Sequence, residues 1–191
     1  MPQSEYRELV ETLGEVVTAT GKTLVVWQEA AAAPLPPGAL VQLWHSEMPT
    51  AGVLAAAARG HDGILSPSAH VYLDMSYEPA YPLGQDWSGH VDLRQSWEWD
   101  PGTAVEGLDP ARVRGVEAAL WTETVTTREE LFTMLLPRLA AAAEVAWTGQ
   151  EARDAGGFEG FAARVATLAP GWRARGWPFH PTAQVPWVGG A

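Results

Sequence analysis

Apolar residues in the first part of this chain recur at helical spacing and then in short runs. Residues 4–20 carry leucine and valine at intervals of three and four, which predicts a helix. The short apolar runs at 23–27 and 39–44 predict buried strands. An alanine-rich stretch at 50–59 predicts a second helix, which Gly60 ends because glycine commonly follows a helix. The apolar positions of the first helix are Leu9, Leu13, Val16 and Val17.

Two further strand regions follow the second helix. The third strand region comprises 63–66 and 71–73, which Ser66-Pro67-Ser68 separates. Many glycines and prolines between residues 75 and 113 predict a long excursion with short helices. The apolar run after this excursion predicts a fourth strand at 115–121.

Helices are predicted after the fourth strand. Residues 128–146 have the spacing of a long helix, and 158–168 have that of another. The segment from Pro170 onward is rich in proline and tryptophan, and we expect it to wrap the surface. The inward positions of the long helix are Leu131, Leu135, Leu136, Leu139 and Val145.

The alternation of strands and helices predicts the fold class. Near-continuous apolar strands that alternate with helices are typical of a parallel sheet covered by helices. The pattern contains about four such units, whereas a complete eight-stranded barrel needs roughly 250 residues. We therefore expect an α/β fold that is either half of a barrel or a small open sheet.

Composition narrows the range of partners. The chain has 191 residues, 47% of them hydrophobic and 18% charged, which is the balance of a globular domain with a sizeable core. Its net charge of -11 argues against nucleic acid or an anionic membrane as the main partner, because both would repel it. A neutral substrate fits this charge better.

Residue types also limit cofactors and compartment. The absence of cysteine excludes disulfides and cysteine-ligated metals, and it leaves the redox compartment undetermined. The five histidines lack metal-ligand spacing, so we expect neither a metal nor another cofactor. Residues 1–5 have neither a basic start nor an apolar core, and no run approaches a membrane span. As written, the chain is expected to stay in the cytoplasm.

Tryptophans and a tyrosine stand where the predicted strands end. Trp121 and Glu123 lie two residues apart at the expected exit of the fourth strand, so they should share one face of it. An indole offers a flat apolar wall to a pyranose ring, and a carboxylate accepts hydrogen bonds from hydroxyls. Trp27, Trp44 and Tyr72 end other strand regions in a similar way. This pattern predicts one site, suited to a sugar.

Several separate blocks of residues occur in the order found in one enzyme family. The blocks are Gly21-Lys22-Thr23 with Trp27-Gln28-Glu29, Gln42-Leu43-Trp44, Gly60-His61-Asp62 with Ser66-Pro67, Tyr72-Leu73-Asp74-Met75, Asp86-Trp87, and 115–123. Together they resemble the C-terminal half of the catalytic TIM (β/α)8 barrel of glycoside hydrolase family 20, the β-N-acetylhexosaminidases. Residues 137–139 and 143–147 resemble the last barrel helix of that family. The resemblance implies a partial barrel over residues 1–180 and a tail at 181–191.

The resemblance implies roles for individual residues. Trp27, Trp44 and Trp121 would form the aromatic walls around the 2-acetamido group of a terminal N-acetylglucosamine or N-acetylgalactosamine. Tyr72 would donate a hydrogen bond to the acetamido carbonyl oxygen. The family uses a retaining, substrate-assisted mechanism in which that oxygen attacks the anomeric carbon.

Three more residues would contact the ring hydroxyls. Asp74 and Trp87 would lie on the side of the 6-hydroxyl, and Glu123 would bind the 4-hydroxyl. The substrates implied are N-acetylhexosamine-terminated glycans or chitooligosaccharides. Full-length relatives in this family are often exported.

The catalytic acid of the family is missing from this sequence. In the family an adjacent Asp-Glu pair, at the end of the fourth barrel strand, orients the acetamide and protonates the leaving group. No Asp-Glu dipeptide occurs in the chain, which resembles the family from just after that pair. A general acid must reach the glycosidic oxygen, so we expect the chain alone to be inactive.

Three hypotheses about function follow. The chain is part of a β-N-acetylhexosaminidase whose first half is supplied separately or was lost, or it is a non-catalytic amino-sugar-binding remnant. The third hypothesis is an unrelated small α/β enzyme that uses Glu29 and Glu123. Gly21-Lys22-Thr23 is not a phosphate loop, because the segment precedes a strand and the upstream glycine lies too far away.

A half-barrel also predicts association. Its edge strands, 23–27 and 115–121, would leave backbone groups unpaired, so the chain should bind a separate N-terminal half or itself. The side chains expected to lose cover are Val25, Val41, Leu43, Ile64 and Val116. The remaining tryptophans are expected to serve packing or surface cover: Trp97, Trp99, Trp147, Trp172, Trp177 and Trp187.

Overall fold

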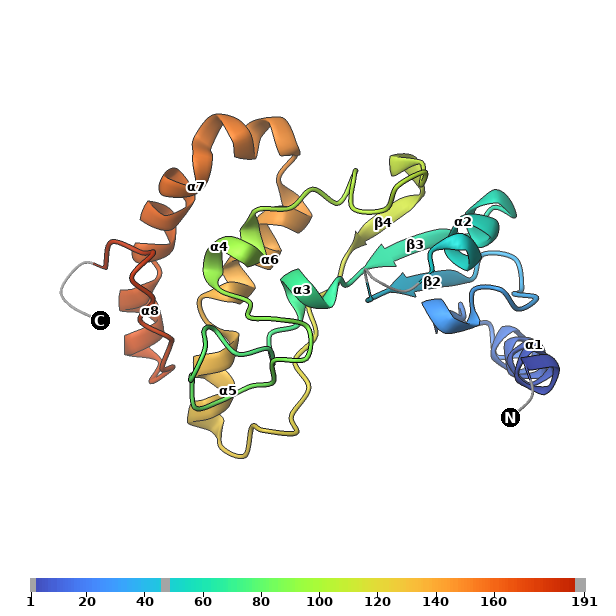
Figure 1. The fold of residues 1–191 in the computed structure, drawn as a ribbon, viewed down its shortest axis with the longest axis horizontal. Coiled ribbons are helices and arrows are strands. Elements are labelled where there is room, and N and C mark those ends of the chain that lie inside the picture. Colours follow the sequence, from blue (N-terminus) through green and yellow to red (C-terminus); the bar gives the residue numbers. More distant parts are fainter. Residues whose placement is uncertain (1–2, 46–48, 188–191) are drawn as a thin grey trace. The chain divides into compact units, whose positions relative to one another are not determined.

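A computed structural model describes residues 3–45 and 49–187 of the chain. The chain divides into two compact units (Figure 1). Unit 1 comprises Met1–Pro67 and Pro101–Val116, and unit 2 comprises Ser68–Asp100 and Glu117–Ala191.

Unit 1 is a parallel sheet with helices. The strands form one four-stranded sheet in the order β1-β2-β3-β4, which confirms the predicted α/β architecture and places β1 and β4 at its edges. The strands are β1 (Val25–Trp27), β2 (Leu40–Leu43), β3 (Asp62–Leu65) and β4 (Val113–Val116). The helices are α1 (Gln3–Ala19) and α2 (Ala51–Ala58), and the 3-10 turns are η1 (Gln28–Ala30) and η2 (Pro110–Arg112).

The register of the strands shows which side chains share a face of the sheet. Val41 and Leu43 lie on the face that α2 covers, and both are buried. Val25 and Ile64 project from the opposite face, where Val25 is 46% exposed. The expectation that these side chains lose cover was therefore wrong for Val41 and Leu43, because residues along a strand point alternately to opposite faces and α2 covers the face of these two.

The strands predicted at 71–73 and 115–121, which lead to Tyr72 and Trp121, differ from those in the structure. Residues 71–73 are not a strand: α3 (Ser68–Val71) is a short helix, and Tyr72 makes an isolated parallel bridge to Ala119. Strand β4 ends at Val116, five residues before Trp121. The apolar run continues past Val116, so hydrophobicity alone did not mark where pairing ends.

Unit 2 is mainly helical. The long helix predicted at 128–146 is two helices, because Pro137 has no backbone N–H and its ring clashes with the preceding turn. The helix predicted at 158–168 starts earlier, at Gln150, and bends at Gly157, whose φ is +63°. The helices are α4 (Leu93–Trp97), α5 (Arg128–Leu135), α6 (Arg138–Trp147), α7 (Gln150–Ala166) and α8 (Ala169–Ala174).

The core of unit 2 includes the segment expected to wrap the surface. Trp172 of α8 and Val185 are buried beside Phe158 and Phe161, so this segment contributes to the core instead of covering it. Trp97 and Trp99 are also buried, and Trp177 and Trp187 pack against the same unit, as packing tryptophans were expected to. Trp147, in contrast, is 90% exposed at the end of α6. Leu139 of the same helix, expected to point inward, is 39% exposed.

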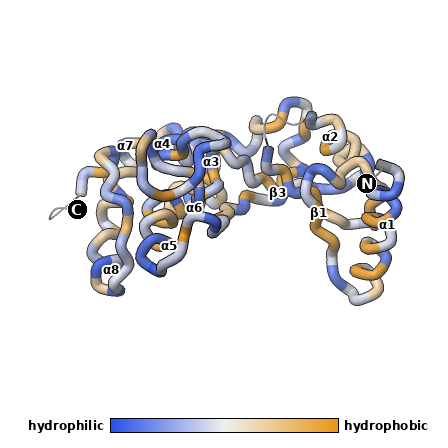
Figure 2. The backbone as a smooth tube through the Cα atoms, turned by 60° about the horizontal axis from the view of Figure 1, so that its bottom comes forward, coloured by the Kyte–Doolittle hydropathy of each residue, from blue (hydrophilic) through white to orange (hydrophobic). Residues whose placement is uncertain are grey.

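One flank of α1 is apolar and exposed. Apolar and polar residues alternate along α1 (Figure 2). Val10 and Gly14 are buried, but Leu9, Leu13 and Val16 are 44%, 50% and 58% exposed. The predicted helix is confirmed, while the inward placement of three of its apolar residues is not. Within residues 3–45 and 49–187, no helix is long and apolar enough to cross a membrane.

Candidate functional site

The carboxyl ends of β1 and β2 place two of the expected residues at one edge of the sheet. Trp27 is the last residue of β1 and Trp44 follows β2, and the two strands are parallel. Gln28 joins these ends: its Oε1 accepts hydrogen bonds from the backbone N–H groups of Trp44 and His45 at 2.8 and 2.9 Å. Gln28 is 6% exposed and was not predicted as a site residue. Only its place in the sequence, between Trp27 and Glu29, could have indicated that Gln28 belongs to this region.

Glu29 has a partner in this structure. The indole Nε1 of Trp44 donates a hydrogen bond to Glu29 Oε1 at 2.8 Å. A carboxylate that accepts a hydrogen bond from an indole N–H can fix the orientation of that indole. This contact explains Glu29 without a catalytic function.

A ring cluster in unit 2 contains three of the expected residues. The ring of Tyr72 lies 6.1 Å from Trp87 and 6.1 Å from Trp121, in both cases edge to face. The bridge between Tyr72 and Ala119 brings the two segments together, because Leu73 N donates to Ala119 O at 2.7 Å. Tyr72 is buried, while Trp87 and Trp121 are 47% and 43% exposed, so the indoles offer accessible surface.

Asp74 is the most unusual residue of this cluster. It is 1% exposed, and neither carboxylate oxygen has a partner with hydrogen-bond geometry. Burial raises the pKa of Asp74, and the charge of Glu123 raises it further. The backbone N–H groups of Trp121 and of Asp74 itself lower this pKa in part, although neither meets the geometry of a hydrogen bond to the carboxylate. A buried carboxylate without a hydrogen-bond partner is unfavourable unless another group supplies the donors.

Glu123 does not stand on a strand. It lies in a turn after Trp121 and is exposed, so the expected sharing of one strand face by these two residues was wrong. Its charge still acts on Asp74, which shows that the two carboxylates are near one another. The position of Glu123 is therefore set by the turn after Trp121, and not by the alternation of side chains along a strand.

The expected residues therefore fall into two groups. Unit 1 brings Trp27 and Trp44 to one sheet edge. Unit 2 brings together the ring cluster and the two carboxylates: Tyr72, Asp74, Trp87, Trp121 and Glu123. The convergence of both groups on a single sugar stays a prediction.

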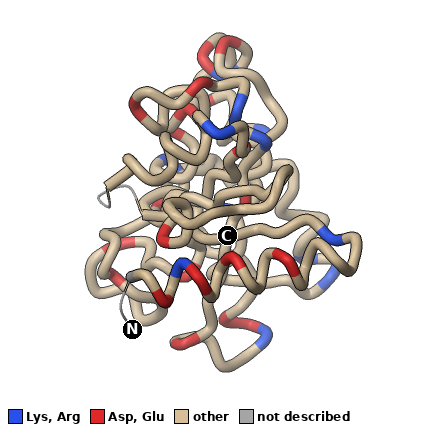
Figure 3. Tube along the Cα trace, turned by 90° about the vertical axis from the view of Figure 1, so that its right-hand side faces the viewer, with Lys and Arg blue, Asp and Glu red and all other residues tan. Residues whose placement is uncertain are grey.

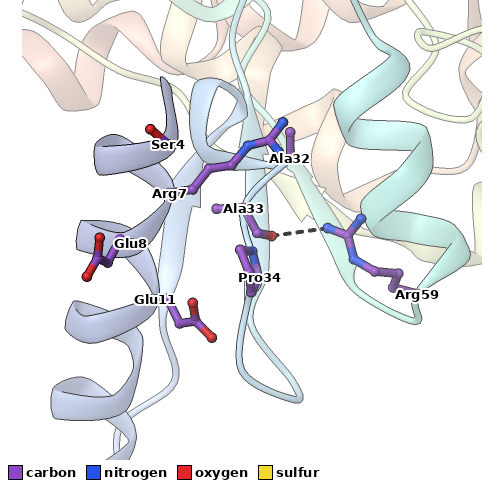
Figure 4. A pocket seen from close by; sticks show the side chains of 8 residues that line it. All are labelled: Ser4, Arg7, Glu8, Glu11, Ala32, Ala33, Pro34 and Arg59. Carbon is purple, nitrogen blue, oxygen red and sulfur yellow. Dashed lines mark hydrogen bonds between the residues drawn. The ribbon is translucent and has the colours of Figure 1, made fainter. Parts of the chain in front are cut away.

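Metal-binding groups and a pocket in unit 1 are the other candidate features of the described residues. Over residues 3–45 and 49–187, no group of three or more His, Cys, Asp or Glu could hold a metal ion. A pocket of about 550 Å³ in unit 1 lies between α1, the segment at 32–34 and Arg59 (Figure 4). Arg59 is engaged there with the carbonyl oxygens of Ala31 and Ala33. The pocket has no aromatic wall, and α1 beside it carries several acidic residues (Figure 3).

Four parallel strands with helices are the architecture expected of part of a (β/α) barrel. Residues 3–150 match glycosyl hydrolase family 20, catalytic domain. The chain belongs to this family.

Relatives and solved structures agree with this assignment. A β-N-acetylhexosaminidase of Cellulomonas fimi is 45% identical over 99% of the chain and 38% of that protein. The structure of a family 20 β-N-acetylhexosaminidase from Streptomyces coelicolor A3(2) superposes with a TM-score of 0.92 at 38% identity. It covers 98% of the chain, which spans 38% of that structure. A mutant Streptomyces plicatus β-hexosaminidase with bound product GlcNAc is 37% identical, with the same TM-score and coverage.

Proposed function

We propose that the chain supplies part of the sugar-binding site of a β-N-acetylhexosaminidase. The observation that carries the proposal is the partly exposed ring cluster of Tyr72, Trp87 and Trp121 beside the unpartnered, buried carboxylate of Asp74. Aromatic faces suit the apolar side of a pyranose, and an unpartnered carboxylate suits its hydroxyls. The protein with the same fold that holds GlcNAc supports this choice of sugar.

The roles proposed for these residues follow the resemblance to the family. Tyr72 donates a hydrogen bond to the acetamido carbonyl oxygen, and the indoles of Trp27, Trp44 and Trp121 enclose the acetamido group. Holding that oxygen against the anomeric carbon is a proximity effect, which is worth several kcal/mol in well-oriented systems. The substrates proposed are glycans and chitooligosaccharides with a terminal N-acetylhexosamine.

The contacts to the ring hydroxyls fall to Asp74, Trp87 and Glu123. Asp74 and Trp87 would bind on the side of the 6-hydroxyl, and Glu123 would bind the 4-hydroxyl. Each hydroxyl donates a hydrogen bond to a carboxylate oxygen. A sugar bound in this way would give Asp74 the hydrogen-bond donors that it lacks in the free chain.

Hydrolysis requires a group outside this sequence. No Asp-Glu dipeptide is present, so protonation of the leaving group is proposed to come from a complementary half of the barrel. The two relatives described above are more than twice as long as the chain, which is consistent with such a half. A non-catalytic remnant that only binds the sugar is the second candidate, and the same ring cluster supports it.

Replacement of Trp121 by alanine is expected to abolish detectable binding of N-acetylglucosamine, because the sugar loses an apolar wall. The intact chain should bind the sugar at millimolar affinity or weaker, since it holds only part of the contacts. Sugar-induced shifts of indole N–H signals in NMR spectra report binding. Trp147→Ala is the matched control, because Trp147 is exposed and belongs to the same unit.

The outcome of this titration decides the proposal. Unchanged binding by Trp121→Ala, or equal losses in both variants, would contradict the assignment of the ring cluster. Glucose, which has no acetamido group, should bind more weakly than N-acetylglucosamine. Equal binding of the two sugars would exclude an acetamido pocket.

The exposed flank of α1 supports the proposed association. Leu9, Leu13 and Val16 lie on this flank, in the same unit as edge strands β1 and β4. Burying side chains of this size stabilises by about 1.5 to 3 kcal/mol each, so a partner that covers them would gain substantially. A half-barrel or a second copy of the chain could supply that cover.

The double substitution Leu13→Glu with Val16→Lys is expected to lower self-association, because it removes apolar surface and adds charge to the flank. Light scattering at micromolar concentration would show a smaller mean mass than for the unchanged chain. Leu168→Lys is the control, since Leu168 is 44% exposed in unit 2. A chain that is monomeric before any substitution would contradict self-association.

A further inference from the structure

Arg138, the first residue of α6, is a cation buried in unit 2. Its side chain is 0% exposed, and both terminal nitrogens donate to backbone carbonyls. The acceptors are the carbonyl oxygens of Met75 and Val91 for Nη1, at 2.6 and 2.8 Å, and of Leu73 and Met134 for Nη2, at 2.6 and 2.8 Å. Burying a guanidinium is unfavourable unless hydrogen bonds compensate, and here the four carbonyls satisfy Nη1 and Nη2 while Nε has no hydrogen-bond partner.

Two of the four carbonyls flank Asp74. Arg138 binds the residue before it, Leu73, and the residue after it, Met75. The carbonyl of Asp74 itself accepts from Gln85 N at 2.9 Å. The backbone of Asp74 is therefore held on both sides while its carboxylate stays without a hydrogen-bond partner.

An aromatic stack supports the guanidinium. Its Cζ lies 3.7 Å from the centroid of the Tyr77 ring, and the imidazole of His180 stacks on that ring at 3.9 Å and 21°. Both groups are too close to the centroid to share one face, so they occupy opposite faces of the ring. The Tyr77 hydroxyl lies 3.0 to 3.2 Å from the carbonyl oxygens of Thr133, Met134 and Leu136, to which it can donate.

His180 belongs to the segment that follows α8. Its backbone N–H donates to Leu136 O at 2.9 Å, just before α6 begins. The ring of Tyr81 meets the rings of both His180 and Tyr77 edge to face. Burial and the charge of Arg138 lower the pKa of His180 to about 4, so a neutral imidazole closes the stack at neutral pH.

We propose that Arg138 is a positioning residue for Asp74, and that His180 closes the stack that holds Arg138 in place. A fixed guanidinium fork holds the carbonyls on either side of Asp74 and so sets the direction of its carboxylate. The segment that contains His180, about a hundred residues after Asp74 in the chain, thereby controls the proposed contact between Asp74 and the sugar. The statement about the sugar rests on the proposed function, whereas the statement about the Asp74 backbone does not.

Replacement of His180 by alanine is expected to loosen the backbone around Asp74, because Tyr77 loses the ring on one face. Hydrogen exchange of the Gln85 amide, which bonds to Asp74 O, should accelerate about tenfold through local opening. His180→Phe keeps a planar ring and should restore slow exchange. The Val165 amide in α7 is the internal control, because Val165 lies in the core of the same unit.

Each result of the exchange experiment has a definite meaning. Selective acceleration at Gln85 with rescue by phenylalanine supports the proposal. Equal acceleration at Gln85 and Val165 would mean that His180 only stabilises unit 2, and it would overturn the proposal. An unchanged Gln85 amide would also overturn it.

Sugar binding tests the functional part separately. Arg138→Lys keeps the charge but loses the planar fork, so it should weaken binding of N-acetylglucosamine several-fold while the helix content measured by circular dichroism is retained. His180→Ala should weaken binding as well, and His180→Phe should not. Full affinity in both Arg138→Lys and His180→Ala would overturn the link to the sugar. Failure of the unchanged chain to bind any amino sugar would instead contradict the proposed function and leave the exchange result to judge the positioning of Asp74.

Discussion

No release of chromophore above background is expected when the purified chain meets an aryl N-acetyl-β-glucosaminide. The residues proposed for the site would bind and orient the sugar, and the Asp-Glu pair that the family resemblance implies for protonating the leaving group is not in the sequence. General acid catalysis contributes typically about 10²- to 10⁴-fold, so its loss is measurable in a standard assay. Addition of the part of the Cellulomonas fimi relative that the chain does not match should restore turnover if the two pieces assemble.

Two variants make this assay decisive. Glu29→Gln should leave the background rate unchanged, because Glu29 accepts a hydrogen bond from the Trp44 indole and its role is positional. The family resemblance implies an Asp-Glu pair in the added piece, and replacing its acid should then abolish the restored turnover. Activity of the isolated chain that Glu29→Gln removes would contradict the family mechanism and favour the third hypothesis, an unrelated small enzyme.

Replacement of Gly84 by alanine is expected to destabilise unit 2 strongly. An added Cβ would lie 2.6 Å from Asp74 O and 2.7 Å from both Ser76 N and Met134 Cε. Overpacking of this kind destabilises by about 1 to 3 kcal/mol. The φ of +89° at Gly84 adds about 1 to 2 kcal/mol, because side chains with a Cβ rarely adopt that conformation.

Gly89→Ala separates the two contributions. Gly89 has a similar φ of +85°, but a Cβ there would meet nothing within 4 Å. Chemical denaturation should show a loss of about 1 to 2 kcal/mol for Gly89→Ala and a clearly larger loss for Gly84→Ala. Equal losses would show that the close approach of Gly84 to Asp74 does not restrict the backbone.

The Gly84 contact also bears on sugar binding. Its nearest neighbour is the backbone of Asp74, the residue whose backbone Arg138 also holds. A shift of a few tenths of an ångström at Asp74 would misdirect its carboxylate. Gly84→Ala is therefore expected to weaken binding of N-acetylglucosamine more than Gly89→Ala does.

The sequence by itself determined the class of fold and most of the residues now proposed for the site. Short apolar runs located β1, β2 and β3 to within two residues and the region of β4, because strand residues that pack in a core leave an apolar run in the sequence. The order of the aromatic blocks identified the family, and the absence of an Asp-Glu dipeptide is visible without a structure. The break at Pro137 was also available from the sequence and was missed.

Only the tertiary structure decided which segments meet. The bridge from Tyr72 to Ala119, and not a strand, brings Trp121 beside Tyr72, since an apolar run reports burial but not its pairing partner. The apolar runs also did not show that Val25 and Val41 point to opposite faces of the sheet, because that depends on which residues pair across the strands.

Buried polar contacts were equally invisible in the sequence. Gln28 and Arg138 look like ordinary surface residues there, yet each bonds to backbone groups distant along the chain. Such contacts depend on how the backbone is arranged in space, and local patterns of hydrophobicity carry no record of it. The unpartnered carboxylate of Asp74, on which the proposed function depends, became visible only when the chain around it was folded.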